Sequence, residues 1–337
     1  MARIVRMHAV GAAEVLRLDE VDVDPPGAGE VLIRVAAIGL NRVESLFRSG
    51  GFGAPALPSK IGYEAAGVIE TTGEGVSEFH AGDRVATLPG LSMEAYGVYG
   101  ELALYPADML VRLPDGQPMT EAAATWMQYL TAYGLIAIAK IKPGDAVIIT
   151  AASSSVGLAA IQIVNAEGGL PIAVTRGRGK AQALLAHGAA HVVVSDEQDL
   201  AQSVLEITGG QGAAIAFDAV GGAAFASLPL AMAHGGMIML YGSLGGDVTS
   251  FPASLTMLRG VTIRGFAMND MLADPVHRRN AIAYINAGLA SGKLRPVIDR
   301  TFDLAEIVEA HRHLESNVQF GKIVVTVDRS APPAIVR

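Results

Sequence analysis

Small polar residues lie together in one stretch whose pattern suits phosphate binding. Residues 146–150 form a short apolar run, a turn of small residues follows, and apolar positions from Val156 onward have helical spacing. In such a strand, turn and helix, a diphosphate binds the free N–H groups and the positive dipole at the helix N-terminus. The fingerprint G-x-G-x-x-G reads Ala152, Ser154 and Gly157 here. Alanine is nearly as small as glycine and serine can bind phosphate oxygens, so we predict a dinucleotide turn, with plain strand-to-helix packing as the alternative.

Basic residues follow the next predicted strand, at residues 171–175. At the end of this strand an acidic residue binds the 2′-hydroxyl of NAD, whereas cations accommodate the 2′-phosphate of NADP. The sequence there contains Arg176, Arg178 and Lys180 and no acidic residue. We therefore predict NADPH, with Arg176 and Lys180 as anchors of its phosphate. A solvated basic loop is the alternative.

The first part of the chain, up to about residue 118, has the pattern of a β domain. A short helix is expected after Asn41, with Glu44 at the spacing of a capping box. Short strands are expected at residues 15–23, 30–38, 64–70, 84–88 and 101–105. Many short strands separated by Gly and Pro turns predict a barrel-like β domain.

From Thr120 the pattern changes to alternating helices and strands. One helix is expected over residues 120–140. Strands are then expected at 146–150, 171–175, 191–194, 213–218, 237–241 and 261–266, with helices at 156–167, 180–187, 199–208 and 223–233. Such alternation predicts a doubly wound parallel sheet that binds its ligand at the carboxyl ends of the strands.

The last part of the chain is expected to return to the first domain. It contains two predicted helices, at 274–290 and 304–316, and an apolar final strand at 322–327. The predicted division is therefore a catalytic domain of residues 1–122 and 268–337, and a nucleotide-binding domain of residues 123–267.

Composition narrows the function classes. The chain has 337 residues, 51% of them hydrophobic, and no cysteine, so disulfides, cysteine–zinc sites and thiol nucleophiles are excluded. The net charge of −8 argues against a nucleic-acid partner. No apolar run reaches the length of a membrane span, and the basic residues near the N-terminus do not form a signal peptide. We expect a cytoplasmic protein.

Several motifs, in order along nearly the whole chain, resemble the medium-chain dehydrogenase/reductase superfamily. The resemblance is to its zinc-independent quinone oxidoreductases, the zeta-crystallin-like branch. The motifs that carry it are IGLNRVESLFRSG, GYEAAGVIE, AGDRV, LTAYGL, AASSSVGLAAIQI, FDAVGG, LYGS and HRHLESNVQFGKIVV. The resemblance implies an α/β protein: a GroES-like β-rich catalytic domain, a Rossmann-type doubly wound sheet of six parallel strands that binds NADPH, and a homodimer.

The resemblance also bears on metal binding. In the zinc-dependent alcohol dehydrogenases of the superfamily, Cys, His and a second Cys or Asp bind the catalytic zinc. Those places correspond here to Asn41, Tyr63 and Met127. An amide, a phenol and a thioether do not make a zinc site, so we predict no metal.

The family roles transfer to a set of cofactor residues. The diphosphate is assigned to Ser153, Ser154, Ser155 and Val156, and the 2′-phosphate to Thr175, Arg176 and Lys180. The ribose is assigned to Ala219 and Val220. The nicotinamide side is assigned to Tyr241, Gly242, Ser243 and Phe266 and, from the catalytic domain, to Asn41, Gln128 and Thr131. Asn317 and Lys322 stand where the family often has a basic contact, although Asn317 departs from the family's Arg.

The substrate pocket departs from the family. Two tyrosines that quinone reductases of this branch often have correspond to Leu46 and Phe52. The other aromatic candidates for the pocket wall are Tyr63, Tyr96, Trp126 and Tyr129, each with ordinary core or interface packing as the alternative.

The resemblance implies hydride transfer from NADPH to a quinone or to the C=C bond of an α,β-unsaturated carbonyl. Asn41 is expected to hold the nicotinamide carboxamide or to polarise the substrate oxygen, and Tyr63 or solvent to supply the proton. Two alternatives stay open. One is a non-catalytic NADPH-binding protein, crystallin-like or RNA-binding, and the other is a carbonyl or alcohol dehydrogenase.

Overall fold

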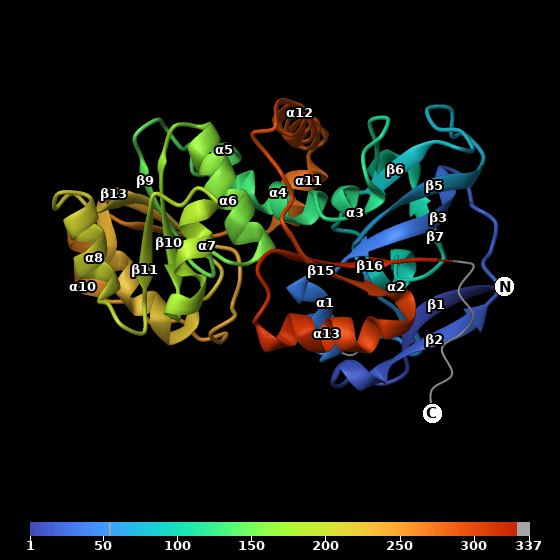
Figure 1. The fold of residues 1–337 in the computed structure, drawn as a ribbon, viewed down its shortest axis with the longest axis horizontal. Coiled ribbons are helices and arrows are strands. Elements are labelled where there is room, and N and C mark those ends of the chain that lie inside the picture. The colour runs from blue at the N-terminus through green and yellow to red at the C-terminus, as the bar shows by residue number, and fades with distance from the viewer. Residues whose placement is uncertain (54, 329–337) are drawn as a thin grey trace. The chain divides into compact units, whose positions relative to one another are not determined.

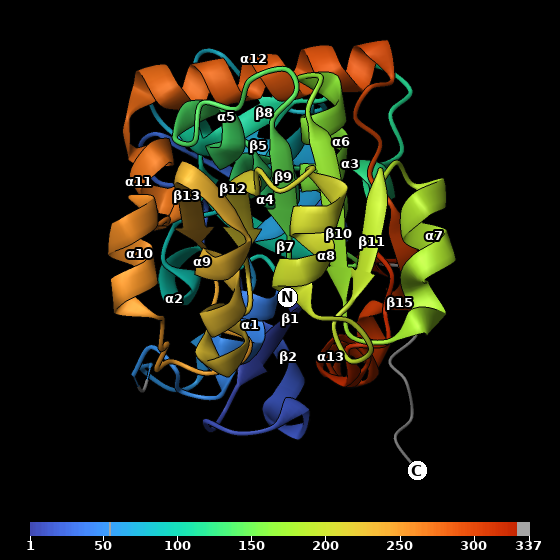
Figure 2. The ribbon, with the colours of Figure 1, turned by 90° about the vertical axis from the view of Figure 1, so that its left-hand side faces the viewer.

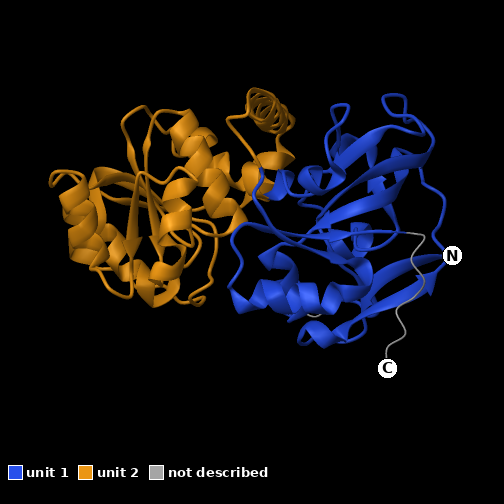
Figure 3. Cartoon of the chain, viewed as in Figure 1, with its two compact units in different colours: residues 1–127, 296–337 blue, residues 128–295 orange. Residues whose placement is uncertain are grey.

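The computed structural model describes residues 1–53 and 55–328. The chain forms two compact units, residues 1–127 with 296–337 and residues 128–295 (Figure 3). No helix in the described part of the chain combines the length and the apolar character needed to cross a bilayer.

Unit 1 is rich in β-strands, as the turn-rich pattern of its sequence predicts, and its strands form two sheets. A three-stranded sheet has the order β2 (Leu16–Val21), β1 (Ala2–Met7) and β4 (Ser59–Lys60). A seven-stranded sheet runs in the order β15 (Ile298–Asp303), β16 (Lys322–Thr326), β3 (Glu30–Gly39), β5 (Glu64–Thr72), β6 (Arg84–Thr87) and β8 (Leu110–Arg112), with β7 (Leu102–Pro106) also paired to β3. The predicted return of the final strand to the first domain is confirmed, because β16 pairs with β3.

Short helices connect the strands of unit 1. They are α1 (Arg42–Arg48), α2 (Met93–Tyr96), α3 (Met119–Ala122) and α13 (Ile307–Ser316), with single 3₁₀ turns at Ala13–Val15, Ala107–Met109 and Leu304–Glu306. As predicted, α1 begins directly after Asn41, whose N–H donates to the Glu44 carboxylate at 2.6 Å.

Unit 2 contains a six-stranded sheet in which every strand is parallel to its neighbours (Figure 2). Its strands in chain order are β9 (Ala146–Ile149), β10 (Leu170–Thr175), β11 (His191–Val194), β12 (Ala213–Asp218), β13 (Met232–Leu240) and β14 (Thr262–Gly265). Their order across the sheet is β11-β10-β9-β12-β13-β14. The predicted doubly wound sheet is confirmed, and the strand order reverses between β9 and β12, the point where such sheets bind dinucleotides.

Helices lie on both faces of this sheet. Figure 1 shows α8 and α10 on one side of it and α5 and α6 on the other. The helices are α5 (Gly134–Ala137), α6 (Ser155–Ala166), α7 (Ala181–Ala186), α8 (Leu200–Ile207), α9 (Leu228–Ala231), α10 (Ala253–Arg259), α11 (Met268–Ala273) and α12 (Pro275–Ser291), with 3₁₀ turns at Arg178–Lys180 and Gly222–Ser227.

The single helix predicted over residues 120–140 is wrong. The structure has three short helices there: α3, α4 (Trp126–Ala132) and α5. The physical reason for the first break lies at Glu64. One oxygen of its buried carboxylate accepts the N–H groups of Trp126 and Met127, at 2.5 and 3.1 Å, and so begins a new helix at Trp126.

The compact units are divided later in the chain than the predicted domains. Helix α12 belongs to unit 2 rather than to the first domain, because its Tyr284 donates a hydrogen bond to Glu167 and its ring packs against Tyr133. The predicted boundaries at residues 122 and 267 stay a prediction.

Candidate functional site

The turn after β9 has the features of a diphosphate-binding loop without its first two glycines. Ala151 adopts φ +45°, a left-handed conformation at the start of the turn. Ser154 caps α6, because its Oγ accepts the Gly157 N–H at 3.0 Å. The N–H groups of Ser155 and Val156 have no hydrogen-bond partner within the described residues. These two donors point to anion binding at the N-terminus of a twelve-residue helix.

Gly157 is required by the close packing of α6 on the turn. A Cβ atom there would lie 2.6 Å from the Cα and the carbonyl oxygen of Ala152. This is the packing role of the third glycine in the dinucleotide fingerprint, which explains why the chain keeps that glycine alone.

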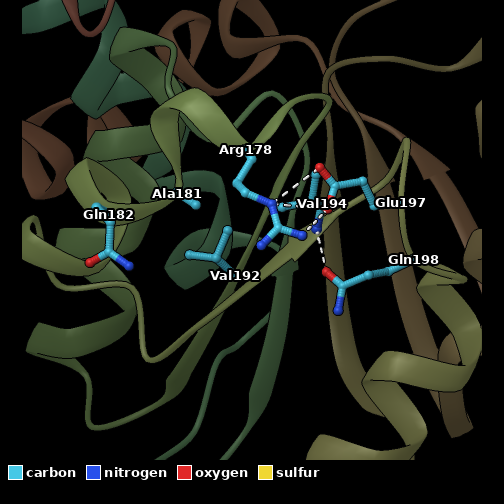
Figure 4. Close-up of a pocket in the computed structure, with 7 residues that line it drawn as sticks. All are labelled: Arg178, Ala181, Gln182, Val192, Val194, Glu197 and Gln198. Atoms are coloured by element: carbon cyan, nitrogen blue, oxygen red, sulfur yellow. Dashed lines mark hydrogen bonds and ion pairs between the residues drawn. The ribbon is translucent and has the colours of Figure 1, made fainter.

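The turn after β10 places three cations near the carboxyl edge of the sheet. Lys180 Nζ donates to Ser153 Oγ at 3.2 Å and so links this turn to the diphosphate loop. Arg178 forms an exposed ion pair with Glu197, and both residues line a pocket to which Gln198 also belongs (Figure 4). Arg176 is exposed and makes no ion pair within the residues that the structure describes. Arg176 is therefore the cation of this turn most available to a 2′-phosphate.

Sequence reasoning missed Asp218, the last residue of β12. Its side chain is 1% exposed, and its Oδ1 accepts the Thr150 hydroxyl at 2.5 Å. The signal was present, because a charged residue ends a strand that is otherwise fully apolar.

The remaining predicted cofactor residues of unit 2 also lie at or near the sheet's carboxyl edge. Ala219 and Val220 follow β12, Tyr241 to Ser243 follow β13, and Phe266 follows β14. The Tyr241 ring stacks on Phe217 at 4.1 Å, and its buried hydroxyl has no partner among the described residues. The predicted cofactor residues share this edge because the carboxyl ends of parallel strands lie on the same side of a sheet.

Two predicted nicotinamide residues lie on α4, in unit 2. The Gln128 side chain is buried, and its Oε1 has no hydrogen-bond donor within the described residues. Thr131 Oγ1 lies 3.8 Å from the sulfur of Met268. Together with the open N–H groups of α6, this orphaned acceptor fits a dinucleotide whose carboxamide can donate a hydrogen bond.

In unit 1 a buried ionic network surrounds Asn41. Lys322 and Glu64 are fully buried and form an ion pair of 2.6 Å, and Lys322 Nζ also donates to Asn41 Oδ1 at 2.6 Å. The Asn41 Nδ2 group donates to the Gly39 carbonyl at 3.0 Å and to Glu44 at 3.3 Å. The Lys322 ammonium is therefore committed inside unit 1, where sequence reasoning expected a cofactor contact.

Glu44 is the second carboxylate of this network. Burial raises its pKa, while hydrogen bonds from Tyr99, the Asn41 N–H and the Tyr63 N–H, together with the nearby Lys322, oppose the rise. Burial first, and then the Glu44 charge, raise the pKa of Tyr63. The Tyr63 phenol is therefore neutral and a weaker acid than an exposed tyrosine.

The predicted pocket residues differ widely in exposure. Leu46 and Phe52 are 40% and 64% exposed, whereas Trp126 and Tyr129 are almost completely buried. The Tyr129 hydroxyl donates to Gln162, and the hydroxyl of the partly exposed Tyr96 donates to Glu30.

The hydrogen bond that the Asn317 side chain accepts comes from Arg42 and not from a residue of the Asn41 network. Asn317 is exposed, adopts φ +60° and accepts this hydrogen bond at 2.6 Å. Within unit 1 the structure thus brings Asn41, Tyr63 and Lys322 together through shared partners and leaves Asn317 outside that set.

The donor set does not fit a zinc ion. The Asn41 amide oxygen accepts from an ammonium group, and no cluster of three or more His, Asp or Glu suited to a metal occurs in residues 1–53 and 55–328. With Tyr63 and Met127 at the other two places, no step of the chemistry is assigned to a metal. The absence of a metal stays a prediction.

Comparison with known proteins places the chain in a family. Residues 27–115 match the alcohol dehydrogenase GroES-like domain, which confirms the predicted fold of the first domain, and residues 187–325 match the zinc-binding dehydrogenase family. The chain is 32% identical to a quinone oxidoreductase of Pseudomonas aeruginosa over 96% of its length and 99% of the relative's.

Two further matches extend this finding. A 2-haloacrylate reductase of a Burkholderia species is 30% identical, over 96% of this chain and 98% of that protein. The crystal structure of Escherichia coli quinone oxidoreductase complexed with NADPH superposes with a TM-score of 0.90 at 28% identity, over 97% of this chain and all of that one. The chain therefore belongs to the medium-chain dehydrogenase/reductase superfamily, in its quinone oxidoreductase branch.

Proposed function

We propose that the protein is a zinc-independent oxidoreductase that uses NADPH to reduce a quinone or the C=C bond of an α,β-unsaturated carbonyl. The observation that carries this proposal is the switch point of the parallel sheet in unit 2. There the open N–H groups of α6 lie beside a turn with Arg176 and Lys180 and without an acidic residue. The solved relative that contains NADPH supports the choice of cofactor.

NADPH, when bound, supplies a hydride equivalent to the substrate. The residues of unit 2 bind and orient it: the α6 N-terminus holds the diphosphate, and Arg176 and Lys180 hold the 2′-phosphate. Hydride adds to the β-carbon of an enone and a proton to its α-carbon, or both add to a quinone to give the hydroquinone.

Asn41 and Tyr63 are the proposed catalytic residues. The longest hydrogen bond of the Asn41 amide, 3.3 Å to Glu44, is the one that a substrate or carboxamide oxygen can replace. Tyr63 is half-buried and protonated, so it can deliver the proton that completes the reduction. Besides Tyr63, the accessible members of the predicted pocket wall are Leu46, Phe52 and Tyr96, and they suit a small apolar substrate.

A substrate with an activated C=C bond has one specific argument in its favour. The relative named 2-haloacrylate reductase acts, by its name, on such a bond. Reduction of this bond requires orientation and a proton but no Lewis acid, in agreement with the absence of zinc ligands at Asn41, Tyr63 and Met127.

The test is oxidation of NADPH by the purified protein, with and without a chelator, against a small quinone, an enone and an aliphatic aldehyde, and with NADH for comparison. We expect turnover of the quinone or the enone with NADPH, unchanged by the chelator. Asn41→Ala should lower kcat at least tenfold, and wild-type turnover by this variant would remove Asn41 from the mechanism. Chelator-sensitive aldehyde reduction, or tight NADPH binding without turnover, contradicts the proposal and favours one of the two alternative classes.

We also propose a homodimer formed through unit 2. Met257 and Leu258 on α10 are 75% and 77% exposed, and neighbouring β14 is an edge strand of the sheet. Exposed apolar side chains beside an unpaired strand edge are features of an association surface.

A further inference from the structure

Asp218 is a buried carboxylate that accepts three hydrogen bonds. Its Oδ1 accepts the Thr150 hydroxyl at 2.5 Å and the Val220 N–H at 3.2 Å. Its Oδ2 accepts the Gly221 N–H at 2.9 Å. No cation pairs with it in the described part of the chain. Neutral donors alone therefore hold this charge at the carboxyl end of β12.

Thr150 completes a link between two turns. It follows β9, and its Oγ1 both donates to Asp218 and accepts the Ala219 N–H at 2.9 Å. Strands β9 and β12 are neighbours on the two sides of the switch point. The Thr150–Asp218 pair thus joins the turn that begins the diphosphate loop to the turn predicted to bind the ribose.

The same link extends to the turn after β13. The N–H of Gly245 donates to the Val220 carbonyl at 2.7 Å, and the N–H of Leu244 donates to the Ala219 carbonyl at 3.1 Å. Gly222 has φ +58°, and a Cβ atom there would lie 2.3 Å from the Gly245 carbonyl oxygen. The hydrogen bonds of Asp218 therefore act on the turn after β13 indirectly, through the backbone of Ala219 and Val220.

Asp218 also determines which backbone N–H groups at the carboxyl edge of the sheet stay open to a ligand. The N–H groups of Val220 and Gly221 are used by Asp218, whereas those of Ser155 and Val156 have no partner within the described residues. Open N–H donors for an anionic ligand are therefore present at the N-terminus of α6. In the turn after β12 the corresponding N–H groups already bind the Asp218 carboxylate. This arrangement favours one position for a diphosphate.

We propose that Asp218, with Thr150, is a positioning residue for cofactor binding: it holds the three turns in their ligand-binding geometry before NADPH arrives. This inference rests on the proposed function. A preorganised site binds more tightly because the ligand does not have to order it.

The test compares Thr150→Val, which removes the hydroxyl at nearly constant volume, with Thr150→Ser, which keeps it. Asp218→Asn is the third variant, because its amide cannot accept the Gly221 N–H and the Thr150 hydroxyl as the carboxylate does. The readouts are the Kd of NADPH and of NADH, from quenching of protein fluorescence, and the Tm of the free protein. Asp199→Ala is the matched control, since Asp199 caps α8 in the same unit by accepting the Gln202 N–H and touches none of the three turns.

We expect Thr150→Val and Asp218→Asn to raise the Kd of both nucleotides about tenfold, by the same factor, and Thr150→Ser to remain within about twofold of the wild type. The equal factors arise because the turns hold the part that NADPH and NADH share. Asp199→Ala should lower the Tm, because it removes the cap of α8, without changing either Kd. A wild-type Kd in Thr150→Val overturns the inference, even if Asp218→Asn fails to fold. Failure of the wild-type protein to bind either nucleotide contradicts the proposed function instead.

Discussion

At the residue scale, the ion pair of Lys322 and Glu64 is the main difference between expectation and structure. Sequence reasoning assigned Lys322 to the cofactor, yet its side chain is fully buried and its ammonium binds Glu64 and Asn41. Gly39 makes room for the pair, because a Cβ there would lie 2.7 Å from Lys322 Cε. Because the Lys322 ammonium group can only donate, it fixes the orientation of the Asn41 amide, with Oδ1 toward Lys322.

Lys322→Met should destabilise the protein by about 3–5 kcal/mol, because it leaves the Glu64 carboxylate buried without its counter-charge. The measurement is urea unfolding at pH 7. The double variant Lys322→Met with Glu64→Gln should recover most of the loss, since it removes the second charge and keeps an acceptor for the Trp126 N–H. Wild-type stability of the single variant would contradict the buried pair.

The buried imidazole of His311 should make the protein less stable in acid. Burial first, and then the charges of Arg48 and Arg42, lower its pKa to about 3, and neither ring nitrogen has a partner among the described residues. An unfolded histidine has a pKa of about 6.5, so below that pH the unfolded state takes up a proton that the folded state refuses. The free energy of unfolding therefore falls from pH 6.5 down to about pH 3, and this contribution is fully present above pH 6.5.

The check is urea unfolding of the wild type and His311→Leu at pH 7 and pH 5. Between these values the wild type should lose about 2 kcal/mol more than the variant. Replacement of the exposed His234 by Ala is the control and should leave the pH dependence unchanged. Equal acid losses in the wild type and His311→Leu would show that His311 is protonated in the folded state.

At the scale of elements, local pattern predicted several strands and helices of unit 2 closely, but it missed α10 and α11 and began β13 five residues too late. The predicted strands at 191–194 and 213–218 have the observed bounds, and the helix expected at 199–208 is α8, Leu200–Ile207. Strand β15 was missed, because its sequence IDRTFD is largely exposed and has no apolar run, and it forms by pairing with β16.

The contact of α6 with its turn gives a prediction at this scale. Gly157→Ala places a methyl group against the Ala152 backbone, which cannot move without displacing the β9 turn. We expect a Tm lower by several degrees and an NADPH affinity weakened at least tenfold. Gly265→Ala is the matched control, because a Cβ at Gly265 would meet no atom within 4 Å. Unchanged NADPH binding in Gly157→Ala would show that the turn after β9 is not part of the cofactor site.

At the scale of the whole molecule, the proposed homodimer is tested by size-exclusion chromatography with light scattering. Leu258→Glu puts a charge on the exposed apolar surface of α10 and should shift the protein to monomers while leaving its circular dichroism unchanged. Val276→Glu, at a 53% exposed position on α12, is the control and should leave the mass unchanged. A wild-type protein that elutes as a monomer contradicts the dimer.

The amino-acid sequence alone was sufficient for the family and the parallel sheet, because these depend on periodicity and on motifs within a few residues of each strand end. The edge of the sheet that binds the cofactor stays a prediction. Position after a parallel strand already places Ser154, Arg176 and Ala219 at one edge. The tertiary structure decided what each buried polar group binds. Lys322 and Glu64 are 258 residues apart, and Thr150 and Asp218 are 68 apart. No local pattern encodes such partners, since a buried charge is satisfied by whichever groups the folded chain brings within hydrogen-bond distance.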